Sequence, residues 1–480
     1  MAKNYFFNLL LTLTNLLFPI LSFPYVSRIL GPEGIGKVQF VFSFAQYFAL
    51  IASLGIPIYG MKEIARYKDN PDGRSRVFSE LISIYILTCI SLSVIYLIVI
   101  YSFPYFIVNR EMYLGAMFLI LLGFTNIEWL YSGMEEFRAI ALRSVAFKII
   151  GLILLYLLIK ERSDFKIYLY LLMFSYLGNN ILSLFLLKNK VRFIFSGLKL
   201  KKHLTPLLLI LGTTLAASMY TDMDTVLLGF LSDEKTVGLY TAAVKLSKIS
   251  IPFVISLNFI LLPKIGKDFA DENMDGVKET LSKAFRFIMF FAVPVVFGLA
   301  VLAPEFIALF SGKEFLPATN SMRLLSVLPL IIGFAHFLLF MILVPSGHNK
   351  EMFMCVLGGV VVSVVLNICL VPFYKEVGSA VANVSAELVV TALYFYFIKK
   401  YFSFNYEWKL LAQAVISAIL FIPLVWFIKQ MSLQLVYTLL LSVISCAIIY
   451  ISIQLFLFSN NFVYDIVGFI RLKLVKQNKQ

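Results

Sequence analysis

Four charged side chains lie deep inside two long apolar segments, where a charge is costly and therefore informative. The acids are on segment 204–231, the bases are on segment 237–263, and a short turn at 232–235 joins the two segments. At ~1.5 Å per helical residue, all four fall roughly 10–16 Å from that turn, close to the middle of a hydrocarbon layer ~30 Å thick. The four are Asp222, Asp224, Lys245 and Lys248.

A charge at that depth costs at least ~2.5–3.5 kcal/mol on insertion scales, so each should face a partner or a water-filled cavity. Lys245 and Lys248 are three positions apart and share one helix face, whereas Asp222 and Asp224 cannot both point the same way. One interpretation is a set of buried ion pairs that holds two helices together. The other is a polar cavity inside a transporter, where the two aspartates neutralise the lysines or exchange a cation.

Three further bases stand near the outer ends of apolar segments. Arg28 ends the first segment, Lys37 opens the second, and Arg323 starts a later one. Together with Lys245 and Lys248 they would line a cationic cavity, which suits a substrate that bears phosphate or an acidic sugar. In the simpler alternative, Arg28 and Lys37 only extend their charged ends to the membrane interface.

Three more titratable residues lie within apolar segments: Glu128, His336 and Glu387. For these residues we predict charge compensation or ion coupling, since an ionisable group inside a membrane usually belongs to a transport path. The alternative for His336 is a hydrogen-bonded core residue. No pattern of metal ligands accompanies them, so no metal site is predicted.

The elements that must position these residues are membrane-spanning helices. The chain has 480 residues, is 60% hydrophobic and only 14% charged, and has a mean hydropathy of +0.90. Its apolar runs are too long and too frequent for the core of a soluble domain. The net charge of +14 does not indicate nucleic-acid binding, because the basic residues lie in short loops between apolar segments. We therefore predict an all-α polytopic membrane protein.

Hydropathy predicts about fourteen spans, with twelve to fourteen as the range. If the first span starts inside, the inner loops carry more than twice as many Lys and Arg residues as the outer loops, which places both termini in the cytoplasm. In chain order the spans are 5–29, 38–61, 78–102, 112–133, 140–159, 167–187, 204–231, 237–263, 285–301, 324–344, 353–371, 378–398, 410–428 and 433–458.

The chain also repeats itself at a fixed offset. Gly36 and Gly238 end two similar turns 202 positions apart, and Lys62 and Lys264 open the following basic loops at the same offset. Six spans separate the two turns, so the halves have the same orientation, as in transporters built from parallel repeats. We predict two six-helix lobes, 1–202 and 203–402, related by a pseudo-two-fold axis around a central cavity. Residues 403–480 add two helices and a basic cytoplasmic tail.

The sequence lacks the motifs that other chemistries require. It contains no Gly-rich phosphate loop ending in Gly-Lys-Ser/Thr, no paired His-Glu metal helix and no G-x-S-x-G. The longest hydrophilic stretch, 264–283, is too short for a catalytic domain. An enzyme is therefore not expected, and no cofactor is predicted.

Two motifs resemble a known family. Trp129–Phe137 (WLYSGMEEF), followed by Arg143 and Lys148, and the turn Leu30–Gly36 (LGPEGIG) are similar to the Wzx-type polysaccharide flippases of bacteria. These belong to the multidrug/oligosaccharidyl-lipid/polysaccharide (MOP) exporter superfamily. The resemblance extends over the span count, the turn positions and the basic inner loops.

The resemblance implies two helical bundles beside a cavity that opens alternately to each side of the inner membrane. It implies an undecaprenyl-diphosphate-linked oligosaccharide as substrate, moved to the outer leaflet for O-antigen, capsule or a related polymer. Membrane lipid, a polysaccharide polymerase and a chain-length regulator are the implied partners, with a proton or sodium ion as coupling ion.

Alternatives within the same superfamily stay open at the level of sequence. A drug/cation antiporter would share the fold but favours an acidic cavity, against which Lys245 and Lys248 argue. A lipid II flippase shares the architecture. A major-facilitator transporter would carry a G-x-x-x-D-R/K-x-G-R/K-R loop between spans two and three, and segment 69–76 (DNPDGRSR) matches that pattern poorly.

Overall fold

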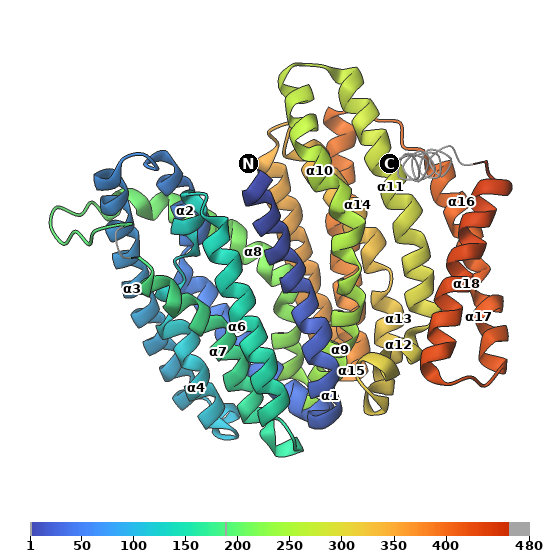
Figure 1. The fold of residues 1–480 in the computed structure, drawn as a ribbon, viewed down its shortest axis with the longest axis horizontal. Helices are drawn as coiled ribbons and strands as arrows, with labels where there is room; N and C mark the ends of the chain where they lie inside the picture. Colours follow the sequence, from blue (N-terminus) through green and yellow to red (C-terminus); the bar gives the residue numbers. More distant parts are fainter. Residues whose placement is uncertain (1, 188–189, 460–480) are drawn as a thin grey trace, which may run out of the picture. The chain divides into compact units, whose positions relative to one another are not determined.

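The computed structural model describes residues 2–187 and 190–459, which form helices joined by short turns, with no strand among these residues (Figure 1). Contacts divide the chain into two compact units, Met1–Gly238 and Leu239–Gln480. The predicted all-α class is confirmed.

The described residues of unit 1 form eight α-helices, the start of a ninth, and three short 3₁₀ turns. The α-helices are α1 (Ala2–Ser53), α2 (Ile56–Arg66), α3 (Pro71–Ser102), α4 (Arg110–Leu121), α5 (Glu128–Gly133), α6 (Phe137–Leu158), α7 (Phe165–Phe185) and α8 (Lys201–Leu231). The 3₁₀ turns are Pro104–Ile107, Gly123–Thr125 and Arg162–Asp164.

Helix α9 (Glu234–Ile249) crosses the boundary between the units, and unit 2 continues from there. Its helices are α10 (Ile251–Ala270), α11 (Met274–Val301), α12 (Ala303–Phe310), α13 (Thr319–Leu325), α14 (Leu328–Leu338), α15 (Asn349–Tyr401), α16 (Trp408–Ile419), α17 (Phe421–Gln430) and α18 (Leu435–Phe456). A 3₁₀ segment (Lys313–Ala318) and a π-helical turn (Leu339–Leu343) complete the described part.

Ten helical stretches of the described residues are long and apolar enough to cross a bilayer, or twelve if each of two bent pairs is one span. Two of the ten, Leu10–Arg66 and Lys350–Tyr401, contain 57 and 52 residues. A straight helix of that length would reach roughly 80 Å, far more than the thickness of a bilayer. In each of the two stretches the chain reverses direction once, so each can cross the bilayer twice. The polytopic membrane character is confirmed, and the count of fourteen stays a prediction.

The first reversal follows from local chemistry. Gly31 has φ 66° and ψ 178°, a conformation that is essentially restricted to glycine, and Pro32 follows it. Figure 1 shows the blue ribbon of α1 running from the N-terminus to the end of unit 1 where its label stands. The predicted turn Leu30–Gly36 is therefore present between two antiparallel halves of α1.

The second reversal divides α15 at Lys375, which has φ 49° and ψ −128°. The hydroxyl of Ser379 donates to Oδ1 of Asn367 at 2.8 Å. Twelve residues of straight helix would hold these groups roughly 18 Å apart, so the chain must fold back between them.

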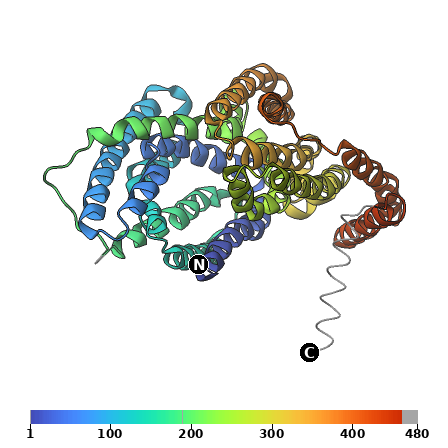
Figure 2. The ribbon, with the colours of Figure 1, turned by 90° about the horizontal axis from the view of Figure 1, so that it is seen from above.

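Aromatic packing holds unit 1 together. The rings of Phe44, Tyr96 and Phe106 from α1, α3 and the following 3₁₀ turn lie 5.2–5.6 Å apart in pairs around Phe44. Phe230 of α8 packs edge-on against Phe40 with centroids 5.2 Å apart, a preferred aromatic geometry. Helix α8 is therefore part of the core of unit 1, and Figure 2 shows its green ribbon beside the blue helices.

Unit 2 has its own core. Phe285 of α11 packs against Phe337 and Tyr406 at 5.9 Å, and Arg286 pairs with Glu407 at 2.9 Å. The last three helices join α11 through buried apolar residues, and the hydroxyl of Tyr450 donates to the carbonyl of Phe290 at 2.8 Å. The predicted additional segment 403–480 thus packs within unit 2 over its described residues.

The contact boundary at 238/239 differs from the predicted lobe boundary at 202/203. The contact boundary records how densely residues pack, whereas the predicted one follows an internal repeat. The division into repeats of 1–202 and 203–402 therefore remains a prediction.

Candidate functional site

The two repeated turns meet at their glycines. A Cβ on Gly36 would lie 1.6 Å from the carbonyl oxygen of Glu234, and a Cβ on Gly238 would lie 1.8 Å from the carbonyl oxygen of Pro32. Pro32 and Glu234 are themselves separated by the 202-residue offset, so the contact is reciprocal, as it is across a local two-fold axis. This close approach within unit 1 explains why glycine stands at both positions.

Arg28 and Lys37 lie on either side of the first turn. Arg28 is exposed and its Nη1 donates to the carbonyl of Pro24 at 2.7 Å. Lys37 pairs with Glu33 at 2.7 Å, and its ammonium group lies 5.3 Å from the centre of the Phe165 ring. The structure thus brings both predicted bases to one hairpin, where Lys37 is largely neutralised.

The predicted aspartates lie beside a bend in α8. The helix turns by 58° between Lys201–Met219 and Met223–Leu231, and the hydroxyl of Tyr47 donates to the carbonyl of Ser218 at 2.9 Å. Asp224 follows the bend and is 1% exposed. The side chain of Asp222 lies outside the described part of the chain.

Lys245 and Lys248 occupy the last turns of α9, in unit 2. Both are half-buried, and their three-residue spacing places them on one face of the helix. The helix is interrupted directly after them: α9 ends at Ile249, and α10 begins at Ile251. Their predicted pairing with Asp224 would join the two units and stays a prediction.

The other candidates of unit 2 are dispersed over three helices. Glu387 on α15 is 3% exposed, and Arg323 on α13 is exposed. His336 on α14 packs against Phe340 with ring centres 5.0 Å apart, and its Nδ1 has no hydrogen-bond partner among the described residues. Their roles in transport or ion coupling are not tested by these positions.

Glu128 begins α5, and its Oε1 accepts from Nδ2 of Asn179 on α7 at 2.9 Å. The ammonium group of Lys148 on α6 donates to Asn15 of α1. Both contacts join helices of unit 1, and the charge-compensating role of Glu128 stays a prediction.

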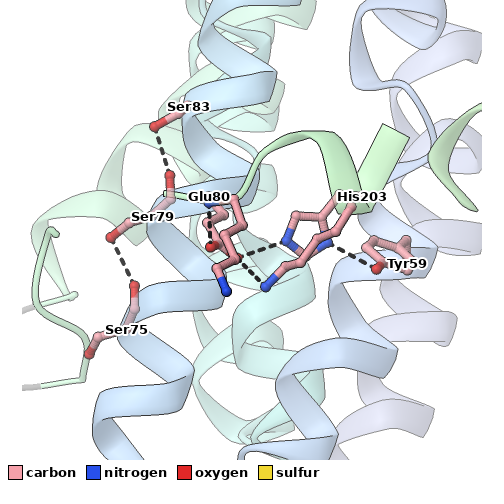
Figure 3. A network of polar contacts seen from close by, with 8 residues as sticks. Tyr59, Ser75, Ser79, Glu80, Ser83 and His203 are labelled. Atoms are coloured by element: carbon pink, nitrogen blue, oxygen red, sulfur yellow. Dashed lines mark hydrogen bonds and ion pairs between the residues drawn. The ribbon is translucent and has the colours of Figure 1, made fainter. Parts of the chain in front are cut away.

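Sequence reasoning missed a buried carboxylate network centred on Glu80 (Figure 3). Glu80 of α3 and His203 of α8 are both 0% exposed. Oε2 of Glu80 accepts from Nζ of Lys202 at 2.7 Å and from Nε2 of His203 at 2.9 Å. Its Oε1 accepts from the backbone N–H of Lys199 at 2.9 Å.

The network orients the two nitrogens of the His203 ring toward different partners. Nε2 of His203 faces the carboxylate of Glu80 and therefore carries a proton, while Nδ1 lies 2.9 Å from the hydroxyl of Tyr59 on α2. In the neutral ring Nδ1 accepts from that hydroxyl. Figure 3 shows the imidazole between Glu80 and Tyr59, so one ring joins α8 to both α2 and α3.

Serines of α3 also hold the segment that joins α7 to α8. The hydroxyl of Ser75 accepts from the N–H of Arg192 at 3.0 Å, and that of Ser79 accepts from the N–H of Ile194 at 2.9 Å. Two signals in the sequence pointed here: a glutamate within the apolar run of the third span, and serines at every fourth position. Their partner lies more than a hundred residues away, which no local pattern reveals.

Comparison with known proteins places the fold. The chain is similar over 97% of its length to the whole of a structure described as "Lipid II flippase MurJ, inward closed conformation", with a TM-score of 0.72 and 15% identity. A multidrug resistance MATE family transporter of the MOP superfamily, in an inward-facing conformation, matches 81% of the chain and 95% of its own length, with a TM-score of 0.63 and 16% identity. These likenesses establish the MOP transporter fold.

Sequence relatives point the same way. A protein of Shigella dysenteriae named "Putative O-antigen transporter" is 25% identical over 404 residues, which cover 81% of this chain and 98% of that protein. The model of the family "Polysaccharide biosynthesis protein" matches residues 1–269, more than half of the chain and all of unit 1. This multi-pass membrane protein therefore belongs to the polysaccharide biosynthesis protein family and has the MOP transporter fold.

Proposed function

We propose that this protein flips undecaprenyl-diphosphate-linked oligosaccharides from the inner to the outer leaflet of the bacterial cytoplasmic membrane, by alternating access. The observation that carries the proposal is the family match over residues 1–269, supported by the O-antigen transporter relative that aligns over 98% of its length. The product would supply assembly of O-antigen, capsule or another surface polysaccharide.

A diphosphate head group brings negative charge into a layer where an unpaired charge is costly, so its path must supply positive groups and water. Lys245 and Lys248 are two half-buried bases on one face of α9, beside a helix break. We assign them to the diphosphate, with Arg28, Lys37 and Arg323 along the same path. The prenyl chain remains outside this polar cavity, because burying a hydrocarbon chain among polar groups gains no free energy.

The carboxylates and the histidine would serve the return step. Asp224 and Glu387 are almost fully buried, and an ionisable group buried within a membrane segment is a candidate for neutralising lysines or exchanging a coupling ion. Asp222, Glu128 and His336 belong to the same proposed set. A proton or a sodium ion is the coupling ion, and a polymerase and chain-length regulator would use the flipped product.

The experiment replaces the native gene by variants at matched protein levels. Lys245→Ala and Lys248→Ala should abolish polymer at the cell surface and cause lipid-linked repeat units to accumulate, measured by immunoblotting and by mass spectrometry of extracted lipid. Lys62→Ala, an exposed lysine of α2, is the matched control and should export normally. Normal export by both test variants would make these charges structural and would overturn the cationic path.

A lipid II flippase is the second candidate. It is favoured by the TM-score of 0.72 to the lipid II flippase structure, which is matched over its whole length. The two candidates differ in the substrate that accumulates. Depletion of this protein should leave cell-wall synthesis intact and lower surface polysaccharide. Lysis with accumulated lipid II would favour the second candidate, while a drug/cation antiporter would leave both polymers normal.

A further inference from the structure

Unit 1 contains a buried cation for which its described residues supply no acidic partner. Arg143, on the second turn of α6, is 5% exposed. No acidic side chain among the described residues pairs with it, and its Nε, Nη1 and Nη2 make no hydrogen bond of good geometry there; the polar group beside it is the hydroxyl of Tyr131. A guanidinium group carries five N–H donors in a rigid fork, and leaving it buried and unpaired is among the costliest arrangements in a protein.

The guanidinium group is nevertheless held in place. Its central carbon lies 4.4 Å from the centre of the Tyr131 ring, a cation–π distance. The hydroxyl of Tyr131 donates to the carbonyl of Ser183 on α7 at 2.7 Å, so the ring itself cannot turn away. Stacking on a ring face leaves the edge of the fork, with its N–H donors, available for an anion.

A second cation lies beside the same ring. The ammonium group of Lys190 is 5.5 Å from the centre of the Tyr131 ring and is paired with Glu136 at 2.5 Å. Glu136 therefore compensates Lys190 and leaves the charge of Arg143 in excess. The planar fork of arginine matches carboxylate and phosphate oxygens in pairs, which selects an oxyanion as the missing partner.

An apolar groove lies along α4, α6 and α7. Its volume is about 540 Å³, and eleven residues line it, nearly all of them apolar. Phe147 in its wall follows Arg143 by one helical turn on the same face of α6, and Leu182 in its wall precedes Ser183, which holds Tyr131. The groove and the cation thus share α6 and α7, an arrangement that fits an amphiphile with an anionic head and a hydrocarbon chain.

We propose that Arg143 binds the phosphate of a prenyl diphosphate whose chain enters the groove of α4, α6 and α7 from the inner leaflet. This inference rests on the proposed function for the choice of a prenyl carrier over an ordinary phospholipid. It assigns a loading site in unit 1, separate from the lysines of α9. By the predicted topology, α6 begins and α7 ends at the cytoplasmic side, where the substrate is assembled.

The test is direct binding to the purified full-length protein in detergent, measured by native mass spectrometry or by fluorescence competition. The probes are farnesyl diphosphate, phosphatidylglycerol and inorganic pyrophosphate. We expect farnesyl diphosphate to bind at least tenfold more tightly than either other probe, because only it supplies both the diphosphate and the prenyl chain. Equal binding of phosphatidylglycerol would overturn the choice of a prenyl carrier, and equal binding of pyrophosphate would overturn the role of the groove.

Three variants locate the site. Arg143→Gln should weaken the binding of farnesyl diphosphate at least tenfold. Arg143→Lys should weaken this binding less, because lysine keeps the positive charge but lacks the planar fork of N–H donors. Leu182→Trp narrows the groove. It should weaken the binding of farnesyl diphosphate and leave the binding of pyrophosphate unchanged. Arg138→Gln, an exposed arginine on the same helix, is the matched control and should bind as the parent protein does.

Two further readouts keep folding and function separate from binding. Thermal unfolding of each variant shows whether it is folded, and Leu182→Trp tests the same site if Arg143→Gln is unstable. Unchanged binding by folded Arg143→Gln would refute the site even if the protein exports polysaccharide. Loss of binding in Arg143→Gln would support it even if the exported substrate proved to differ from the proposed one.

Discussion

At the residue scale, Glu80 shows how a membrane helix can bury a full charge. Three donors converge on its carboxylate: Lys202, His203 and the backbone N–H of Lys199. A buried carboxylate is tolerated only when its lone pairs are satisfied in this way. Arg143 is the opposite case, a buried charge with no acidic partner among the described residues.

Removing the charge at Glu80 should therefore weaken the attachment of α8. Glu80→Gln keeps the shape of the side chain but turns one acceptor into a donor that faces Lys202 and His203. We expect a loss of ~1–3 kcal/mol, seen as a lower unfolding temperature of the purified protein. His203→Ala should have a loss of similar size, since it removes the ring that reaches both Glu80 and Tyr59.

Glu279→Gln is the control for that experiment. Glu279 pairs with Lys283 at the surface of α11, where both side chains are largely exposed, and exposed pairs add little to stability. The unfolding temperature of the Glu279→Gln variant should match that of the parent protein. Equal effects of Glu80→Gln and Glu279→Gln would show that the buried network does not hold α8.

At the scale of elements, the two hairpin turns meet through backbone rather than through side chains. Gly36 and Gly238 each face a carbonyl of the other turn at a distance where no Cβ fits. Small residues allow such close helix contact in membranes, where apolar burial gives little drive for association. The contact within unit 1 therefore depends on the absence of two side chains.

Gly36→Ala and Gly238→Ala should each force the turns apart and destabilise the protein by ~1–3 kcal/mol, as overpacking does. The double variant should cost less than the sum, because either substitution already breaks the shared contact. Thermal unfolding of the three variants measures this coupling. Gly212→Ala, where a Cβ meets nothing within 4 Å, is the control. Additive losses at Gly36 and Gly238 would contradict the reciprocal contact.

At the scale of the whole molecule, charge in the loops predicts how the chain lies in the membrane. More than twice as many Lys and Arg residues fall on the side that holds both termini, as the positive-inside rule requires of cytoplasmic loops. Lys201 and Lys278 then face the cytoplasm, and Arg162 and Lys313 face outward.

Single cysteines at these four positions test the orientation on intact cells with a membrane-impermeant thiol reagent. Positions 162 and 313 should react, and positions 201 and 278 should react only after the cells are opened. Cys369 is an exposed native thiol, so the parent for these variants carries Cys369→Ser. Labelling of position 201 from outside would refute the predicted topology.

Sequence alone determined the features that depend on local composition. Long apolar runs specify membrane helices because a bilayer leaves no other way to satisfy the backbone. Gly31 and Pro32 specify the first reversal because few other residues adopt that backbone conformation. The candidate charges could be found in the same way, since an ionisable group in an apolar run is rare wherever the run folds.

Tertiary structure alone decided which distant residues meet. Glu80 and His203 are far apart in sequence, and their contact depends on how α8 lies against α2 and α3. The sequence placed Arg143 near the start of the predicted span 140–159, and only the structure shows it buried against Tyr131. The offset between Gly36 and Gly238 predicted a repeat, and only packing made the two glycines neighbours. The physical reason is that hydropathy sets the depth of a residue, while helix packing sets the direction in which its side chain points.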